Sequence, residues 1–292
     1  MRYLMKQPSD WENKKLPFFK IVGDNIDLNI SARIQTKEHC NRSLHWTHQF
    51  AVVDRASDPS LETFKKQKSL KDLQYIELLP DPAVQENFIW QWAVLVSRVV
   101  TKYLPPFKVF RKNVIFHIPH KYSTEMTTKS ETCCLGMEFH NPNVAAEMAQ
   151  ILKDYQSNYV PCFVSDKKKE VVATVTVHGD QLFEDRARNV EWTFRDGHNS
   201  YERLEGVPPE HADWHAKVTL FKTEFDMFVK AESAAEIGTS RASMNRTGKF
   251  NAAKGVQTHY NEYKDSHSRE IAAHICASFM VMCGMSKLEG NI

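Results

Sequence analysis

The hydrophobic pattern of the first 54 residues predicts a three-strand meander. Apolar, β-branched and aromatic residues gather in the ranges Phe18–Ile30, Ala32–Thr36 and Leu44–Val53, and such runs are typical of β-strands. The polar run 37–42 separates the second and third ranges, and we expect it to form a turn.

A helix is predicted over residues 82–104. Asp81 can act as its N-cap, Pro82 occupies the first helical position, and two prolines follow its end, which is the usual arrangement of start and stop signals. Polar residues interrupt this most apolar part of the chain, so we expect a buried helix and no membrane partner. A short strand, Val114–Ile118, and a loop are expected before residue 141.

The middle of the chain predicts a helix followed by a buried strand. Asn141 is the expected N-cap of this helix, and its apolar residues recur at helical spacing: Val144, Met148, Ile151, Leu152 and Tyr155. The range Val171–Val177 is apolar almost throughout, which predicts a central strand covered on both faces.

The rest of the chain predicts helices with one exposed basic segment. We expect helices over Leu182–Phe194, from about His215, and over Ile271–Met285, with a loop at Ser240–Gly255. This order of elements predicts an α/β fold with a mixed sheet. The expected division is an extension at 1–17, a core at 18–54 and 141–292, and a helical insertion at 55–140, which is longer than a compact connection needs.

Charge and cysteine content narrow the function classes. The 38 basic and 36 acidic residues leave a net charge of +2, so the chain as a whole lacks the basic footprint of a nucleic-acid-binding protein. Six cysteines without a Cys-x-x-Cys pair fit reduced thiols better than a disulfide framework. Residues 1–20 contain no apolar segment of a signal peptide. We therefore expect an intracellular protein.

Two strand-like runs end in the same short motif of glycine, aspartate and amide. The first is Gly23-Asp24-Asn25 and the second is Gly179-Asp180-Gln181. Two strands that each deliver a carboxylate at one end can hold a pair of divalent ions if the strands are neighbours. Carboxylate oxygens suit Mg²⁺ or Mn²⁺, so Asp24 and Asp180 are the candidate metal and catalytic residues. The simpler alternative is that glycine and aspartate only form turns there.

Two further residues are candidate accessories to this site. Asp27 is an alternative to Asp24, but in a regular strand its side chain points to the opposite face. His215 precedes an apolar helix and could act near a phosphate, although a histidine bonded to the backbone explains it as well. The sequence contains no P-loop, no Gly-x-Ser-x-Gly elbow and no Gly-x-Gly-x-x-Gly loop, which argues against the corresponding enzyme classes.

The two Gly-Asp motifs and the run Asp213-Trp214-His215-Ala216 resemble an uncharacterised family, domain-of-unknown-function family 6589. The resemblance extends over most of the chain from about residue 15. The strand and aspartate layout is similar to transposase cores of the RNase H-like fold, which implies Asp24 as the first acid and Asp180 as the second. The third acid stays open, because Glu224, Glu262, Glu270 and Glu289 do not differ in sequence context. A core that is incomplete at its C-terminal end is an open alternative.

The resemblance implies a transposase-derived domain that cleaves or transfers DNA strands with Mg²⁺ or Mn²⁺. DNA would then be the partner and the nucleus the location. The alternative is a non-catalytic module that binds nucleic acid or protein, which the near-neutral charge and the unassigned third acid favour. Whether the chain is an enzyme, and its oligomeric state, stay open at this point.

Overall fold

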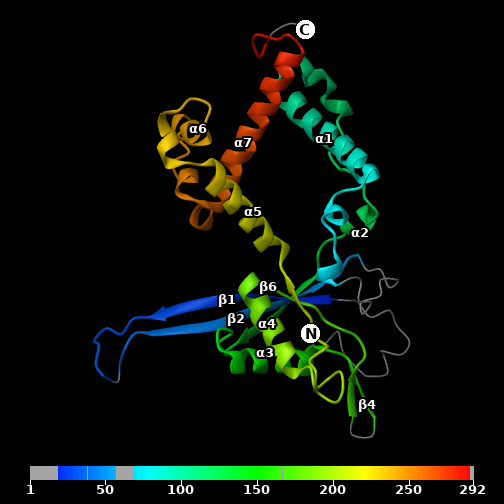
Figure 1. Cartoon of the computed structure of the whole chain (residues 1–292). Helices are drawn as coiled ribbons and strands as arrows, with labels where there is room; N and C mark the ends of the chain where they lie inside the picture. Colours follow the sequence, from blue (N-terminus) through cyan, green and yellow to red (C-terminus); the bar gives the residue numbers. More distant parts are fainter. Residues whose placement is uncertain (1–18, 38, 57–68, 166–167, 290–292) are drawn as a thin grey trace. The chain divides into compact units, whose positions relative to one another are not determined.

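The computed structural model describes residues 19–37, 39–56, 69–165 and 168–289 (Figure 1). The chain divides into two compact units. The sheet unit comprises Met1–Ser57 and Thr124–Lys217, and the helical unit comprises Asp58–Ser123 and Val218–Ile292. The expected core included all of 141–292, whereas the chain after Lys217 groups with Asp58–Ser123. The expected extension 1–17 lies outside the described residues.

A mixed five-stranded sheet forms the centre of the sheet unit, in the order β3-β2-β1-β6-β7. The strand β1 pairs antiparallel with β2 and parallel with β6, β2 pairs antiparallel with β3, and β6 pairs parallel with β7. The expected α/β class with a mixed sheet is therefore confirmed. The strands of this sheet are β1 (Phe19–Ile30), β2 (Arg42–Val53), β3 (Thr132–Glu138), β6 (Val177–Gly179) and β7 (Pro209–His211).

Two helices, α3 (Ala145–Tyr159) and α4 (Gln181–Phe194), pack against this sheet and build its core. The stripe predicted for α3 is confirmed at Met148, Ile151, Leu152 and Tyr155, which are fully buried. They pack with Ile21 of β1, Val177 of β6 and Phe183 of α4. A separate two-stranded sheet joins β4 (Cys162–Ser165) to β5 (Lys168–Val171).

The helical unit has two apolar clusters. One joins α1 (Pro82–Tyr103) to α7 (Val256–Met282) through Val100, Leu104 and Cys276. The other packs around Tyr263 and Met244. The remaining elements are α2 (Ser123–Met126), α5 (Asp213–Phe228), α6 (Ser240–Arg246) and the 3₁₀ segments η2 (Leu70–Asp72), η3 (Tyr75–Leu78), η4 (Pro105–Asn113), η5 (Ala231–Ala235) and η6 (Ala252–Lys254). Among the described residues, no helix combines the length and apolar character that crossing a bilayer requires.

Two of the predicted strands are wrong. Residues 32–36 belong to the exposed connection between β1 and β2, and the segment 114–118 is not a strand. The strand beside β2 is instead β3, which the sequence placed in a loop. Gly136 of β3 has a positive φ of 98°, and the pairing register shifts between Gln49 and Phe50. A bulge of this kind breaks the regular alternation by which strands are recognised.

Other differences concern element boundaries and one loop. The apolar run 171–177 is divided, because β5 ends at Val171 and β6 starts at Val177. Asn141 does not cap α3: its side chain accepts a hydrogen bond from the Asn143 N–H at 2.9 Å, and the helix begins at Ala145. The segment 240–255 is not an exposed loop but contains α6 and η6, where Met244 and Ala252 are buried. The helix predicted over 82–104 is confirmed with its cap, because Asp81 accepts a hydrogen bond from the Val84 N–H. The expectation that this helix is buried is wrong, since Val94, Val100 and Thr101 are its only buried residues.

Candidate functional site

Asp24 lies on β1 at a point where the strand becomes exposed. Its Oδ1 accepts a hydrogen bond from the Asn25 N–H at 2.9 Å, and its Cα partner on β2 is His48. The preceding Gly23 is buried, and a Cβ there would lie 3.3 Å from a methyl carbon of Thr47. The exposed Asp24 is therefore directly preceded by a residue whose backbone is closely packed.

Asp180 is the residue between β6 and α4, and its carboxylate caps that helix. The Asp180 Oδ1 accepts a hydrogen bond from the Phe183 N–H at 2.7 Å, which satisfies one free donor at the helix start. A Cβ on Gly179 would lie 2.6 Å from the ring of Phe183. The glycine thus lets the helix start pack tightly against the strand, and the partly buried aspartate fixes the direction of the helix.

The structure makes β1 and β6 parallel neighbours, which is the condition that a shared site requires. Val22 on β1 pairs with His178 on β6, and each aspartate follows two residues after this pair. Asp24 and Asp180 are thus each two residues past the same strand pair, but Asp24 lies within β1, which continues to Ile30, and only Asp180 follows the end of its strand. Hard carboxylate oxygens are the ligands that Mg²⁺ and Mn²⁺ prefer, and each side chain uses only its Oδ1 in the hydrogen bonds described above. The donor chemistry of the pair therefore fits a divalent cation.

The two predicted accessory residues have other contacts. Asp27 lies farther along β1, and its Oδ1 is 2.6 Å from Nδ1 of His45 on β2. Asp27 is an odd number of residues from Asp24, so the two side chains leave opposite faces of the strand. His215 lies in the first turn of α5, where its N–H donates to the Ala212 carbonyl. Its ring centroid is 5.0 Å from that of Trp214.

Titratable residues on β1 and β6 that the sequence analysis did not single out make contacts of their own. Lys20 lies 3.8 Å from Asp54, and His178 Nε2 lies 3.3 Å from a carboxylate oxygen of Glu210. Lys20 is on the same face of β1 as Asp24, since alternate residues share a face. Burial, assisted by the charge of Lys20, lowers the pKa of His178, and burial raises the pKa of Asp54. The lowered pKa favours the neutral form of the His178 ring. Its place directly before Gly179-Asp180 was the signal in the sequence that could have identified it.

In the part of the chain that the structure describes, a third metal-binding carboxylate does not accompany the pair. Among the residues that the structure describes, no group of three or more His, Cys, Asp or Glu side chains is placed to hold a metal ion. Two of the four glutamates considered above are paired within the helical unit: Glu224 with His267 at 3.2 Å, and Glu262 with His259 at 3.8 Å. The arrangement supplies two carboxylates and leaves the third position unassigned.

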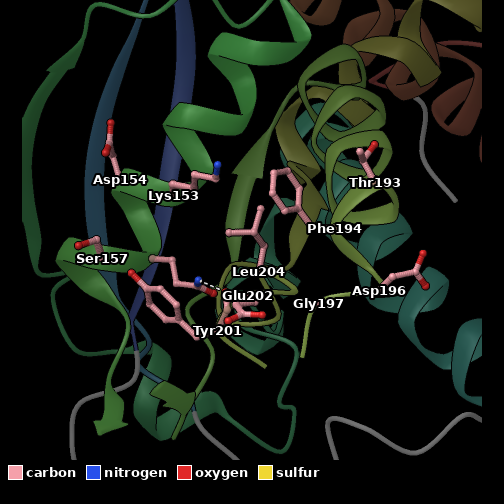
Figure 2. Close-up of a pocket in the computed structure, with 11 residues that line it drawn as sticks. Lys153, Asp154, Ser157, Thr193, Phe194, Asp196, Gly197, Tyr201, Glu202 and Leu204 are labelled. Atoms are coloured by element: carbon pink, nitrogen blue, oxygen red, sulfur yellow. Dashed lines mark hydrogen bonds between the residues drawn. The ribbon is translucent and has the colours of Figure 1, made fainter. Parts of the chain in front are cut away.

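A separate cavity of about 580 Å³ lies between α3 and the end of α4 (Figure 2). The side chains of Phe194 and Leu204 line it, and the ammonium of Lys153 lies 4.7 Å from the centre of the Phe194 ring. Leu204 is buried and has a positive φ of 58°, which is unusual for a bulky residue. The side-chain amide of Gln156 holds the adjoining segment by donating to the Tyr201 carbonyl. This cavity is a small, mainly apolar pocket on the sheet unit.

Comparisons with known proteins give one family. Residues 65–290 match the model of a family described as Family of unknown function (DUF6589). No curated protein and no solved structure matches the chain. The match includes Asp180 and His215, whereas Asp24 and Asp27 precede it.

Proposed function

Because the chain belongs to the DUF6589 family of unknown function, which supplies no activity, we propose a function from the sheet unit itself. The proposal is a transposase-derived, RNase H-like domain that cleaves or transfers DNA strands with the help of divalent metal ions. Asp24 and Asp180 are its metal-binding residues. The single observation that carries the proposal is the parallel pairing of Val22 with His178 directly before the two aspartates.

The order of the sheet supports the RNase H-like part of the proposal. Three antiparallel strands, β1 to β3, are followed by two strands that extend the sheet on the other side of β1. The first acid of an RNase H-like site lies on the first strand and the second at the end of the strand beside it. Asp24 on β1 and Asp180 at the end of β6 occupy these places.

The chemistry follows from the two carboxylates and their surroundings. Divalent ions bound by both would activate a water or a 3′-hydroxyl and stabilise the leaving oxygen of a phosphodiester. Asp180 is held by its bond to the start of α4, so its remaining oxygen is positioned in advance. His178 lies two residues before Asp180, and its Nε2 is 3.3 Å from a carboxylate oxygen of Glu210.

The experiment is a nicking assay on supercoiled DNA in Mn²⁺ with the wild-type chain and Asp180→Asn. Asparagine is as good an N-cap as aspartate, so the variant should fold normally while losing the charge that binds the ion. We expect nicking to fall at least about a hundredfold, as for the loss of one electrostatic transition-state contact. Asp185→Asn is the matched control, because Asp185 is an exposed acid on the same helix.

Two outcomes would contradict the proposal. Equal nicking by wild type and Asp180→Asn would remove Asp180 from the site. Absence of nicking by the wild type, with DNA binding retained, would favour the second candidate function, a non-catalytic binding module. The observation that favours this second candidate is the missing third carboxylate among the described residues.

A further inference from the structure

One long stretch of the helical unit contains no acidic residue. From Asn87 to Ser123 the sequence has six lysines and arginines and no aspartate or glutamate, whereas the whole chain has 36 acids in 292 residues. The basic residues are Arg98, Lys102, Lys108, Arg111, Lys112 and Lys121. A near-neutral net charge therefore conceals a strongly basic segment.

The fold brings the parts of this segment together. The guanidinium of Arg98 on α1 donates to the Ile115 carbonyl at 2.9 Å. The guanidinium carbon of Arg111 on η4 lies 5.6 Å from the centre of the Phe116 ring. Lys108 and Arg111 are three residues apart, so they lie on one side of the 3₁₀ segment. These two contacts hold α1, η4 and the segment that follows η4 next to one another, so that most of the basic residues of this stretch lie on neighbouring elements.

Aromatic side chains are exposed among these charges. Tyr103, Phe110 and Phe116 are 44%, 53% and 61% exposed. The ammonium of Lys102 lies 4.7 Å from the ring of Tyr103. We define the basic aromatic surface as the exposed side chains in the range Lys102–Phe116.

The helix packed beside this surface does not neutralise it. Phe107 of η4 contacts Phe279 of α7 with ring centroids 5.1 Å apart. Residues 271–288, which include this end of α7, contain no acidic side chain. In the part of the helical unit that the structure describes, no ion pair involves Lys102, Lys108 or Lys112. The positive charge is therefore available to a ligand.

We propose that the basic aromatic surface binds single-stranded DNA. Lysines and arginines follow the phosphates, and exposed aromatic rings stack on unpaired bases, which is how proteins hold single strands without sequence preference. The inference deepens the proposed function and rests on it for the choice of DNA as the nucleic acid. It assigns the place where a strand is held, in a unit that contains neither Asp24 nor Asp180.

The test is binding of the full chain to a fluorescent 20-nucleotide oligo-dT, measured by anisotropy in EDTA so that no cleavage occurs. Lys108→Glu/Arg111→Glu/Lys112→Glu should lower the affinity at least thirtyfold. It should also reduce the magnitude of the slope of log affinity against log salt concentration by about two. Phe110→Ala/Phe116→Ala should lower it about tenfold or more with an unchanged slope. The matched control is Lys129→Glu/Lys254→Glu/Lys264→Glu, which makes the same charge change at exposed positions elsewhere.

Each other outcome has a defined meaning. An equal loss in the control variant, or no loss in the first, would overturn the assignment of the surface. Tighter binding to a duplex of the same length would overturn the single-strand preference, and binding to phosphatidylserine vesicles but not to DNA would make the surface a membrane site. Asp180→Asn should bind like the wild type. Absence of nicking by the wild type, with binding that the Lys108→Glu/Arg111→Glu/Lys112→Glu variant loses, contradicts only the catalytic proposal. Unchanged binding by that variant, with nicking by the wild type that Asp180→Asn loses, contradicts only this one.

Discussion

At the residue scale, the two Gly-Asp motifs have different packing although their sequences match. A Cβ on Gly179 would meet three atoms of Phe183 at 2.6 to 2.8 Å, whereas a Cβ on Gly23 would meet one methyl carbon at 3.3 Å. Phe183 is itself buried in the core. The glycine before Asp180 is therefore required by helix packing, and the glycine before Asp24 is more tolerant.

Gly179→Ala should destabilise the protein more than Gly23→Ala. We expect a loss of about 1–3 kcal/mol of unfolding free energy for the former, because overpacking displaces the Phe183 ring or the start of α4. Urea denaturation of both variants measures the difference. Equal losses would mean that α4 adjusts without cost.

Glu191 on α4 makes stability depend on pH. Burial raises the pKa of this carboxyl to about 7, against a smaller opposing effect of Arg188. A raised pKa means that the folded state holds the proton more tightly than the unfolded state. The stabilisation of the folded state by the proton on Glu191 is therefore complete below about pH 4.5 and is lost as the pH rises to about 7.

Glu191→Gln should stabilise the protein at pH 8 and leave it nearly unchanged at pH 4. The expected gain at pH 8 is about 1 kcal/mol, because a glutamine avoids the cost of a partly buried charge. Urea denaturation at the two pH values provides the measurement, with Asp185→Asn as the exposed control. A gain that is the same at both pH values would contradict the assigned cause.

At the element scale, the far ends of β1 and β2 form a two-stranded ribbon. The pairs of β6 with β1 involve only Ile21 and Val22, and the pairs of β3 with β2 begin at Thr47. Beyond that point Leu28 and Ile30 are 41% and 52% exposed. An isolated ribbon of this kind is marginally stable by itself.

Replacing residues 28–44 by Asn-Gly should change the unfolding free energy by less than about 1 kcal/mol. The dipeptide suits a two-residue hairpin turn, and the Asp27–His45 ion pair would close it. Urea denaturation and circular dichroism report the outcome. A loss of several kcal/mol would show that the ribbon packs against another part of the chain.

The elements also show how far local pattern can predict structure. The stripe of α3 and the cap of α1 were predictable, because helices are stabilised by residues a few positions apart. The strand β3 was missed, because its identity depends on pairing with β2 some eighty residues earlier in the chain. The division of the run 171–177 has a similar cause, since Val175 donates to the Gly206 carbonyl and not to a neighbouring strand.

At the scale of the whole molecule, the two units have separate cores. Ile151 belongs to the cluster of the sheet unit and Met244 to one of the helical unit, and these clusters have no residue in common. Both side chains are fully or almost fully buried. Damage to one core is therefore expected to stay within its own unit.

Ile151→Ala and Met244→Ala should each cost about 2–5 kcal/mol of unfolding free energy, and each should act locally. Hydrogen exchange measured by mass spectrometry should show lost protection in α3 and α4 for the first variant, and in α6 and α7 for the second. The changes in unfolding free energy that substitutions cause at distant sites usually add. Loss of protection in both units from one substitution would instead indicate a single cooperative structure.

The sequence by itself determined the helices with a regular apolar stripe, the family and the identity of the two aspartates, because these depend on neighbouring residues or on motif similarity. Only the tertiary structure decided that β1 and β6 are parallel neighbours, that β3 completes the sheet, and that most of the cations of one basic stretch lie on neighbouring elements. Strand pairing and surface assembly join residues far apart in the chain, and no local pattern records such partners. The candidate site is therefore a property of sheet order as much as of its residues.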